Sequence, residues 1–472
     1  MVKDASELEI TTDSSAVVDA INSFVDQLLG VGNDAQVILK AVEADPACAI
    51  ANAQVAAFYL FTGGSIALTK AKSHLKVAKS YLKRANDREK LYVAAIEAWA
   101  NRDIAQAIAH HEAMSTTGFA YAIAFPRDLA SVHLAQYHYR NSGNSQGMLL
   151  IAEKVFAANR DNPYMYGMLA FGLEECHRLA QAEEYGRIAI ALKRDNRWAH
   201  HAVAHVLETQ GRLEEGISLM ESLSDTWEYG SSAFYGHLWW HTSLYYLDIE
   251  NFAKVLEIYD TRIWGRAKKD NGREQINAIA LLLRLELRGV DIGSRWQELA
   301  PYLQPRIHEH TLAFLDLQYI YALVRGGKDD WAAEMLESMQ NHGENVLPYG
   351  RRTWIEVGVP AARGMIAHAR GDWESAIAQL EPVLPDLYST GGSHAQRDLF
   401  EQIYLDALIR DRQYHKTLNV LEKRNASRGN IPVIQRELAN TYSQLGRSDK
   451  AHQASQLALE LSQRYQKVEQ TV

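Results

Sequence analysis

The chain has 472 residues and a formal net charge of −9, from 49 basic and 58 acidic residues that are mixed along its length. This balance excludes a binder of duplex nucleic acid, which needs a basic stripe, and the presence of only two cysteines excludes a disulfide framework. No apolar run reaches the roughly 18 residues of a membrane span, and the polar N-terminus lacks an apolar signal core, so we expect a cytoplasmic protein without membrane contact.

Apolar residues recur at spacings of three and four through almost the whole sequence, as in VVDAINSFVDQLL from Val17 and AIANAQVAAFYLF from Ala49. Alternating runs of Val, Ile and Thr, which would indicate strands, are almost absent. The period of these apolar residues is that of amphipathic helices. The sequence therefore predicts an all-α protein without a sheet.

One turn signature returns along the chain. A helix ends in a Gly, Asp, Asn or His, and a short polar link leads into a helix with small residues on one side. The clear examples begin at His177, Gly211, Glu250, Gly371 and Gly446, and looser ones lie near Arg102, Gly143, Gly289, Gly327 and Asp411. Successive turns are 34 to 44 residues apart. The pattern predicts about ten antiparallel helix pairs.

A helix–turn–helix unit of about 34 residues is the tetratricopeptide spacing. In two adjacent units of this length, Ala182 and Gly216 hold the small position at which the paired helices approach. No linker is long or polar enough to divide the chain. We therefore predict a tetratricopeptide-like right-handed superhelix over residues 1–472, with divergent N-terminal helices in 1–90 and the repeat region in 91–472.

Two His-x-x-x-His pairs, His201/His205 and His237/His241, fall on successive predicted helices. A spacing of four places both rings of a pair on one helix face. The first pair alternates with Ala and Val, so its face favours burial, and a buried polar group without a partner costs roughly 1–3 kcal/mol. A ligand pocket, structural hydrogen bonding and a metal clamp are the alternatives. We expect no metal, because no His-Glu-x-x-His motif is present. His200, at the helix start, is expected to be exposed.

The aromatic residues around Trp240 recur at helical spacing and favour packing, with Trp240 retained as a candidate ligand contact. Glu174 and Glu208 occupy equivalent positions in adjacent units. We expect both to face solvent or to pair with Arg178 and Arg212, the arginines four positions later.

Asp316 lies in the apolar pattern FLDLQYIYAL. A carboxylate among such neighbours needs a histidine or arginine partner if it is buried. An Asp–His contact would orient the ring and raise its basicity, which is both a common structural arrangement and that of a general base.

The segment GGSHAQRD, from Gly391 to Asp398, predicts a glycine loop, an N-cap at Ser393 and a helix with His394 and Arg397 in its first turns. A helix N-terminus suits a carboxylate or phosphate, and Arg397 could clamp the anion with two hydrogen bonds. Asp398 also has a structural interpretation, pairing with Arg397 or a nearby histidine. We expect this turn to face the same cavity as the histidine helices.

Four strings, DNPYMYGMLAFGLEE, WAHHAVAHVLETQGR, GHLWWHTSLYYLD and GGSHAQRDLFEQ, resemble the tetratricopeptide repeat protein 38 family in order and spacing. FPRDLAS, from Phe125, is similar to the family's Pro-Arg-Asp segment, in which Asp128 is expected to cap a helix or pair with Arg127. The resemblance runs from roughly residue 90 to the end and implies a fold more than a reaction. The family's Phe-x-Asp-x-His appears here as FLDLQ, with Gln318 in the histidine place.

Two functions remain open. In the first, the inner helices enclose a pocket for a small polar or anionic molecule, with acid–base turnover left open. The candidate catalytic residues are His201, His205, His237, His241 and Asp316, and the candidate ligand contacts are His394, Arg397, Asp398, Trp240 and Gln318. In the second, an open groove binds a peptide or partner protein without catalysis. Histidines flanked by alanine favour the pocket. No cofactor is expected, and homo-oligomerisation is left open.

Overall fold

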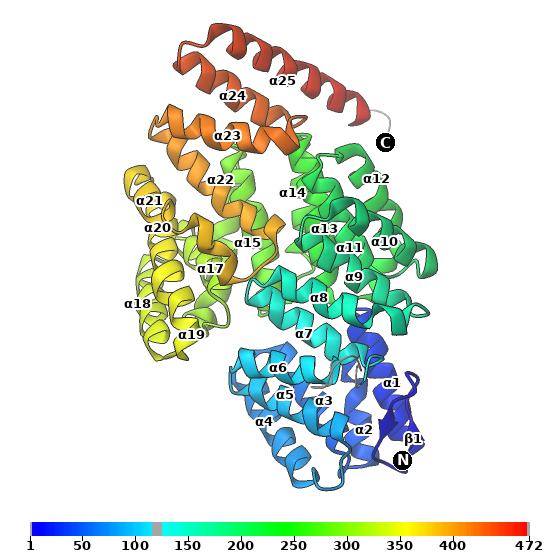
Figure 1. Cartoon of the computed structure of the whole chain (residues 1–472). Coiled ribbons are helices and arrows are strands. Elements are labelled where there is room, and N and C mark those ends of the chain that lie inside the picture. The colour runs from blue at the N-terminus through cyan, green and yellow to red at the C-terminus, as the bar shows by residue number, and fades with distance from the viewer. Residues whose placement is uncertain (1, 116–124, 470–472) are drawn as a thin grey trace. The chain divides into compact units, whose positions relative to one another are not determined.

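The computed structural model describes residues 2–115 and 125–469, which form 25 α-helices (Figure 1). The predicted all-α class is confirmed. One small sheet was not predicted: β1 (Val2–Lys3) pairs antiparallel with β2 (Glu9–Ile10) ahead of the first helix. No helix in the described ranges is both long and apolar enough to cross a membrane.

The chain divides into two compact units. Unit 1 comprises Met1–Val203 and Thr226–Ser231, and unit 2 comprises Ala204–Asp225 and Ser232–Val472. The boundary therefore falls inside helix α11 (Arg197–Thr209) and again inside the short 3-10 helix η3 (Ser224–Tyr229).

Unit 1 begins with a group of helices whose buried core includes Val17, Ile21, Phe24 and Ile50. Further along, α9 packs against α10. The helices of unit 1 are α1 (Ser15–Leu29), η1 (Ala35–Ile38), α2 (Leu39–Ala44), α3 (Ala49–Thr62), α4 (Gly64–Ser80), α5 (Asp87–Ala100), α6 (Ile104–Ser115), α7 (Leu129–Asn141), α8 (Ser145–Phe156), η2 (Ala157–Asn159), α9 (Pro163–Glu175) and α10 (Leu179–Leu192).

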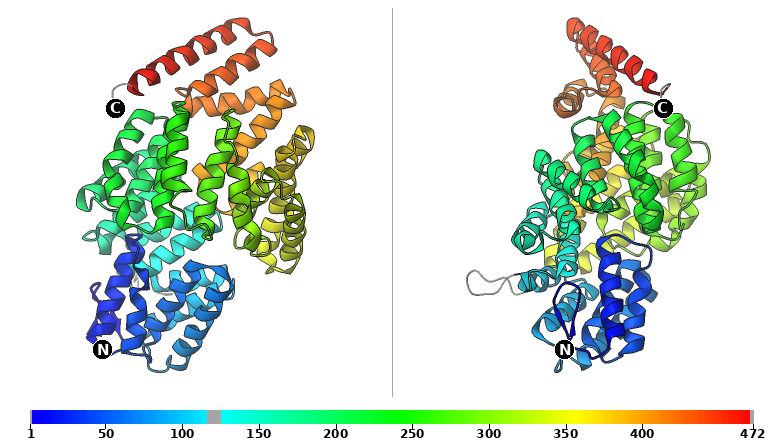
Figure 2. Two further views of the ribbon diagram at one scale, coloured as in Figure 1. Left: turned by 180° about the vertical axis from the view of Figure 1, so that it is seen from behind. Right: turned by 90° about the vertical axis from the view of Figure 1, so that its right-hand side faces the viewer.

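Unit 2 continues the pattern of packed helix pairs, and α24 and α25 run antiparallel side by side in every view (Figure 2). Its helices are α12 (Leu213–Leu223), α13 (Ser232–Asp248), α14 (Phe252–Ile258), η4 (Tyr259–Ile263), α15 (Gly272–Leu287), α16 (Arg295–Leu299), η5 (Ala300–Arg306), α17 (Ala313–Arg325), α18 (Asp329–Asn345), α19 (Pro348–Arg351), η6 (Arg352–Gly358), α20 (Val359–Ala369), α21 (Trp373–Leu380), η7 (Leu384–Thr390), α22 (His394–Arg410), α23 (Tyr414–Arg428), α24 (Pro432–Gln444) and α25 (Ser448–Glu469).

The turns found in the sequence are helix ends of one geometry. Each holds a residue in the left-handed region, and the next residue donates its N–H to the carbonyl five positions earlier, as Arg212 does to Leu207. This bond satisfies a carbonyl that the ended helix would otherwise leave without a partner. The left-handed residues are Arg102, Gly143, His177, Gly211, Glu250, Gly289, Gly327, Gly371, Arg412 and Gly446. The regular turn sets the repeat.

The predicted close approach of paired helices occurs at Gly216. A Cβ atom on this residue would lie 2.3 Å from Cε1 of Tyr245 on α13, so only glycine fits without displacing the ring. Ala182, the equivalent residue of the preceding repeat, is fully buried. The described chain is thus a tetratricopeptide-like array of helix pairs.

Candidate functional site

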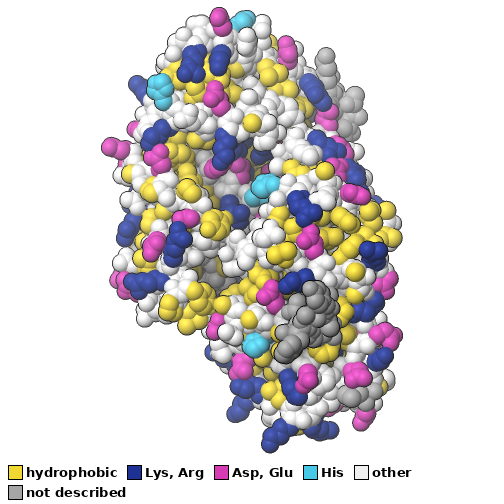
Figure 3. All heavy atoms as spheres, in the orientation of Figure 1, with side chains coloured by type: hydrophobic (Ala, Val, Ile, Leu, Met, Phe, Trp, Pro, Cys, Tyr) yellow, Lys and Arg dark blue, Asp and Glu magenta, His cyan; other side chains and the backbone are white. Residues whose placement is uncertain are grey.

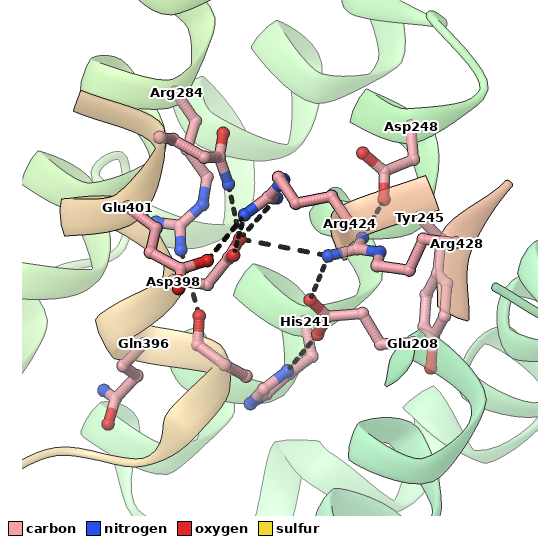
Figure 4. Close-up of polar contacts among 12 residues, drawn as sticks. Glu208, His241, Tyr245, Asp248, Arg284, Gln396, Asp398, Glu401, Arg424 and Arg428 are labelled. Atoms are coloured by element: carbon pink, nitrogen blue, oxygen red, sulfur yellow. Dashed lines mark hydrogen bonds and ion pairs between the residues drawn. The ribbon is translucent and has the colours of Figure 1, made fainter. Parts of the chain in front are cut away.

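Five helices of unit 2 direct polar side chains toward one buried cluster (Figure 4). Each helix contributes residues spaced three or four apart, so that they share one face. We call this group the polar cluster. It comprises His205 and Glu208 of α11, His237, His241, Tyr245 and Asp248 of α13, Arg284 and Arg288 of α15, His394 and Asp398 of α22, and Arg424 and Arg428 of α23.

Histidines from three helices meet at one end of the cluster. The ring centroid of His205 lies 4.6 Å from that of His241 and 5.2 Å from that of His394. The His237 and His241 rings are 4.7 Å apart, with their Nε2 atoms 3.3 Å apart. Three members of the two predicted pairs and the predicted His394 therefore lie together.

The remaining histidines of α11, His200 and His201, lie in unit 1. His201 contacts Phe171 and Trp198, at ring distances of 4.9 and 5.6 Å. The expectation that His200 is exposed was wrong, because this residue is fully buried. Its Nε2 lies 2.7 Å from the Arg194 carbonyl oxygen, and its Nδ1 accepts a hydrogen bond from Trp227. The ring folds back over the start of α11 instead of facing solvent.

Burial keeps His241 neutral. Loss of solvent and the nearby His205, His237 and Arg284 hold the pKa of His241 well below its ordinary value of 6.5. Its Nδ1 lies 3.7 Å from a carboxylate oxygen of Glu208. Burial raises the pKa of Glu208, although Arg428 opposes this shift. His241 is therefore a neutral imidazole beside a carboxyl group with a raised pKa.

Ion pairs occupy the other end of the cluster. Arg424 donates to both carboxylate oxygens of Asp398, with Nη2 3.2 Å from Oδ2. Arg428 binds Asp248, which also lies 3.6 Å from Arg288. Burial alone would raise the pKa of Asp398, but Arg424 and Arg428 hold it well below its usual range. This carboxylate is therefore ionised at neutral pH.

Arg284 differs from the other arginines of the cluster. It is 1% exposed, and its two terminal nitrogens donate to the backbone carbonyls of Ala280 and Ala395, at 3.1 and 3.0 Å. The guanidinium lies 5.1 Å from the centroid of Trp240. Among the described residues, no carboxylate lies within ion-pair distance of it. Burial lowers its pKa to about 10, which still leaves the group charged at neutral pH.

The GGSHAQRD turn has the predicted local structure. Gly391 and Gly392 have φ angles of 99° and 78°, and Ser393 caps α22 by accepting from the N–H of Gln396. Arg397 donates to the carbonyls of the two glycines, and Asp398 pairs with Arg424 instead of Arg397 or a histidine. The role of Arg397 as an anion clamp stays a prediction.

Asp316 belongs to a different polar group of unit 2. It is 1% exposed, and its Oδ2 lies 2.7 Å from Nδ1 of His310, which provides the partner expected for a buried carboxylate. Gln318 is buried one half-turn later. Its amide donates weakly to the Phe314 carbonyl at 3.4 Å, and its Oε1 has no hydrogen-bond partner among the described residues.

Asp128 caps α7 through the N–H of Ser131, as predicted, but its ionic partner is Arg88 at 3.1 Å. Arg127 instead pairs with Asp161 at 3.0 Å. Each residue of the string FPRD that carries a charge therefore pairs with a residue far away in sequence, which the string itself could not indicate.

The expectation for the two equivalent glutamates was wrong. Glu174 is fully buried and Glu208 is 6% exposed. The arginines four positions later turn outward, Arg178 to Glu153 and Arg212 to Glu215. The inner face of each repeat, not its surface, carries these acids.

Sequence reasoning also missed Asp248, Arg284, Arg288, Arg424 and Arg428. One signal was available for two of them: Arg284 interrupts the run AIALLLRLEL, and Asp248 ends the run HTSLYYLD. A charged residue on an apolar helix face requires a partner or a ligand, because an isolated buried charge is costly. The arginines of α23 lie in a polar helix that gives no such signal.

Fold and cluster together define a tetratricopeptide-like helical-repeat protein with a buried group of histidines and glutamate. No family model matches the sequence. Among solved structures, the chain is similar to the human IFIT1 dimer with m7Gppp-AAAA, at a TM-score of 0.44 and 15% identity over 97% of this chain and 96% of that one.

It is also similar to the P58(IPK) TPR domain, at a TM-score of 0.22 and 12% identity over 82% of this chain and 99% of that one. At such scores and identities, neither similarity carries an inference about ligand or reaction.

Proposed function

We propose that unit 2 binds a small anionic molecule, a carboxylate or a phosphate, in the polar cluster. Arg284 is the observation that carries this proposal. A fully buried guanidinium without a carboxylate at ion-pair distance has an effective desolvation cost of several kcal/mol, which Asp398 and Glu208 offset only from further away. Two carbonyl contacts and the face of Trp240 offset only part of this cost. A bound anion would provide the missing charge.

The other charges of the cluster support this assignment. Asp398 forms an ion pair with Arg424, and Asp248 forms ion pairs with both Arg428 and Arg288. Arg284 is left as the cation that a ligand can address. Arginine binds planar or tetrahedral oxyanions with two parallel N–H groups, so carboxylates and phosphates are the ligand classes that it recognises best.

Solvent can reach the cluster. The side chains of Arg288, Arg428 and Asp398 remain 13%, 14% and 19% exposed. In the space-filling view, the surface among α13, α15, α22 and α23 is hollowed, with basic and acidic side chains inside the hollow (Figure 3). A small molecule could therefore enter without unfolding a helix.

The histidine end gives the site its chemistry. His241 beside Glu208 offers an unprotonated ring to a ligand held on Arg284. A bound anion would counter Arg284, one of the charges that lower the pKa of His241, so acid–base turnover is part of this proposal. His205 and His394 would supply further hydrogen-bonding groups to the same ligand.

The test is binding of citrate and of inorganic phosphate, followed by thermal unfolding and titration calorimetry. We expect at least one of these probes to raise the melting temperature of the wild-type protein, as any ligand specific for the folded state does. Arg284→Met should abolish this stabilisation, because it removes the unpaired charge while retaining a long side chain.

Arg363→Met is the matched control, because it removes an exposed arginine of α20 in the same unit. This variant should respond to the probes like the wild type. Equal stabilisation of Arg284→Met and the wild type would contradict the proposal, as would failure of both probes to bind the wild type. Arg397→Ala tests the predicted clamp: weaker probe binding at unchanged melting temperature would support it.

Three broader inferences remain proposals. The four strings and FPRDLAS support membership of the tetratricopeptide repeat protein 38 family. The regular helix-end geometry of ten turns supports one superhelix over residues 1–472. The two cysteines, Cys48 and Cys176, are free thiols, which supports a cytoplasmic location. Binding of a peptide in an open groove is the alternative function, and the probe experiment distinguishes it from the pocket.

A further inference from the structure

A second group of polar side chains meets where the segment after η5 lies against α18. Two histidines, His308 and His310, come from this segment, Asp316 from α17 and Ser338 from α18. His310 has a φ of 44°, an uncommon conformation for a residue with a side chain. Such backbone strain is found where the surrounding structure holds a side chain in a required position.

The contacts form a continuous chain from carboxylate to hydroxyl. Asp316 Oδ2 lies 2.7 Å from Nδ1 of His310, and Nε2 of the same ring lies 2.7 Å from Oγ of Ser338. An ionised carboxylate only accepts hydrogen bonds, so Nδ1 carries the proton and Nε2 is the acceptor. Ser338 therefore donates its hydroxyl proton to His310. This arrangement of acid, imidazole and hydroxyl is that of an activated serine nucleophile.

The exposure of the side chains increases from the carboxylate to the hydroxyl. The side chains of Asp316 and His310 are 1% and 3% exposed, and Ser338 is half-buried at the end of the chain of contacts. Burial protects the orienting pair from water, while the hydroxyl remains within reach of a substrate.

A second imidazole bonds to the same hydroxyl. His308 Nδ1 lies 2.8 Å from Ser338 Oγ, and its Nε2 lies 2.9 Å from Glu334, one helical turn before Ser338. Glu334 can only accept, so Nε2 of His308 carries a proton, and Nδ1 donates to the serine oxygen only when both ring nitrogens are protonated. In acyl transfer the negative charge develops on the carbonyl oxygen of the substrate, so His308 contacts the attacking oxygen and is not an oxyanion donor.

The partners of Ser338 are unusual for a serine inside a helix. Such a residue commonly bonds to the carbonyl four positions earlier or faces solvent. Ser338 Oγ instead bonds to the histidines His308 and His310. A structural role for the hydroxyl would need one partner, not two imidazoles that are each bonded to a carboxylate.

We propose that Ser338 is the nucleophile of an acyl-transfer site that hydrolyses small esters, with His310 as base and Asp316 as positioning residue. Oγ bonds to the carbonyl carbon while its proton passes to His310 Nε2. The carbon–oxygen bond to the alcohol breaks, and this proton goes to the leaving oxygen. Water then attacks the acyl-serine, gives a proton to Nε2 and releases the carboxylic acid, and Oγ recovers the proton.

The experiment is covalent labelling of the full chain at pH 8 with a fluorophosphonate, which bonds to an activated serine with loss of fluoride, followed by peptide mass spectrometry. Ser375 on α21, an exposed serine, is the internal reference. We expect Ser338 to react on the order of 100-fold faster than Ser375, the scale of general-base assistance. Ser338→Ala should abolish the label, and Ser375→Ala should leave the Ser338 label unchanged.

Two further variants separate activation from mere exposure. His310→Gln should slow labelling of Ser338 by about 100-fold. Asp316→Asn, which is nearly isosteric, should also slow it, because an amide in place of the carboxylate no longer holds the imidazole in the tautomer that accepts the serine proton. Helical circular dichroism identifies variants that remain folded. Equal labelling of Ser338 and Ser375 in the wild type, or unchanged labelling in folded His310→Gln or Asp316→Asn, would overturn the proposal.

Discussion

The Arg284 guanidinium lies 5.1 Å from the centroid of the Trp240 ring, and no carboxylate among the described residues lies within ion-pair distance of it. This relationship predicts an unusual response to mutation. Arg284→Met should leave the free energy of unfolding unchanged or raise it, because the variant removes a desolvated charge and keeps the apolar stem. Chemical denaturation in the absence of added anions measures the effect.

Arg428→Met serves as the comparison within the same cluster. It would leave Asp248 buried without its closest cation, and Glu208 without the cation that opposes its burial. Removal of one partner from a buried ion pair costs about 3–5 kcal/mol. Similar losses in the Arg284 and Arg428 variants would show that Arg284 is a structural member of the network.

Asp316 should make stability depend on pH in the direction opposite to most carboxylates. Burial raises its folded pKa from 3.8 to about 6, so the folded protein holds a proton that the unfolded chain releases. Stability is therefore highest below pH 3.8 for this group and falls as pH rises to about 6, by ~3 kcal/mol. Asp316→Asn should lack this contribution, and denaturation curves at several pH values from 4 to 7 would reveal it. The same dependence of the free energy of unfolding on pH in the two proteins would contradict the raised pKa of Asp316.

His138 in unit 1 should produce the opposite dependence. It is 1% exposed, burial lowers its pKa from 6.5 to about 3, and its Nε2 lacks a hydrogen-bond partner among the described residues. The folded state keeps the ring neutral while the unfolded chain takes up a proton below pH 6.5. Stability is thus lost on acidification, at about 1.4 kcal/mol per pH unit for this group.

His138→Phe should remove the contribution of one proton from this pH dependence. At pH 5 its free energy of unfolding should equal that of the wild type or exceed it. The neighbouring His111, whose pKa is also well below 6.5 through burial and His138, keeps its own contribution. Thermal unfolding at pH 5 and 7 provides the measurement, and an unchanged difference between the two pH values would refute the assignment.

Gly216→Ala tests the helix approach that sets the repeat. The added Cβ would meet the ring of Tyr245, which is buried and whose hydroxyl donates to the Ala204 carbonyl at 2.6 Å. Overpacking of a fixed core side chain costs about 1–3 kcal/mol, more than the gain in helix propensity of up to ~1 kcal/mol. Ala333→Gly, at an exposed position inside α18, is the control for propensity alone. A more stable Gly216→Ala variant would show that Tyr245 can move.

Much of the fold could be read from the sequence because its signals are local. The helical period, the spacing of the turns and the Ser393 cap each depend on residues within about one turn of each other. Even the non-glycine turn residues His177 and Glu250 followed from the pattern, since the same helix-end bonds recur at every repeat.

The partners of the polar side chains could not be read in this way. Arg428 reaches Asp248 across 180 positions, and His310 reaches Ser338 across 28. A sequence shows which face of a helix is polar, but not which distant helix it meets. His-x-x-x-His and GGSHAQRD therefore indicated His205, His241 and His394 as candidates, while Glu208 was wrongly assigned to the surface.

The sequence by itself determined an all-helical repeat and the residues available to a site, because helix period and helix ends are properties of neighbouring residues. Only the tertiary structure decided that Arg284 is buried with no carboxylate at ion-pair distance among the described residues. It also decided that Asp316, His310 and Ser338 form a continuous series of hydrogen bonds. Those relationships depend on how successive helices stack, and desolvation in the packed interior then sets which charges must be paired.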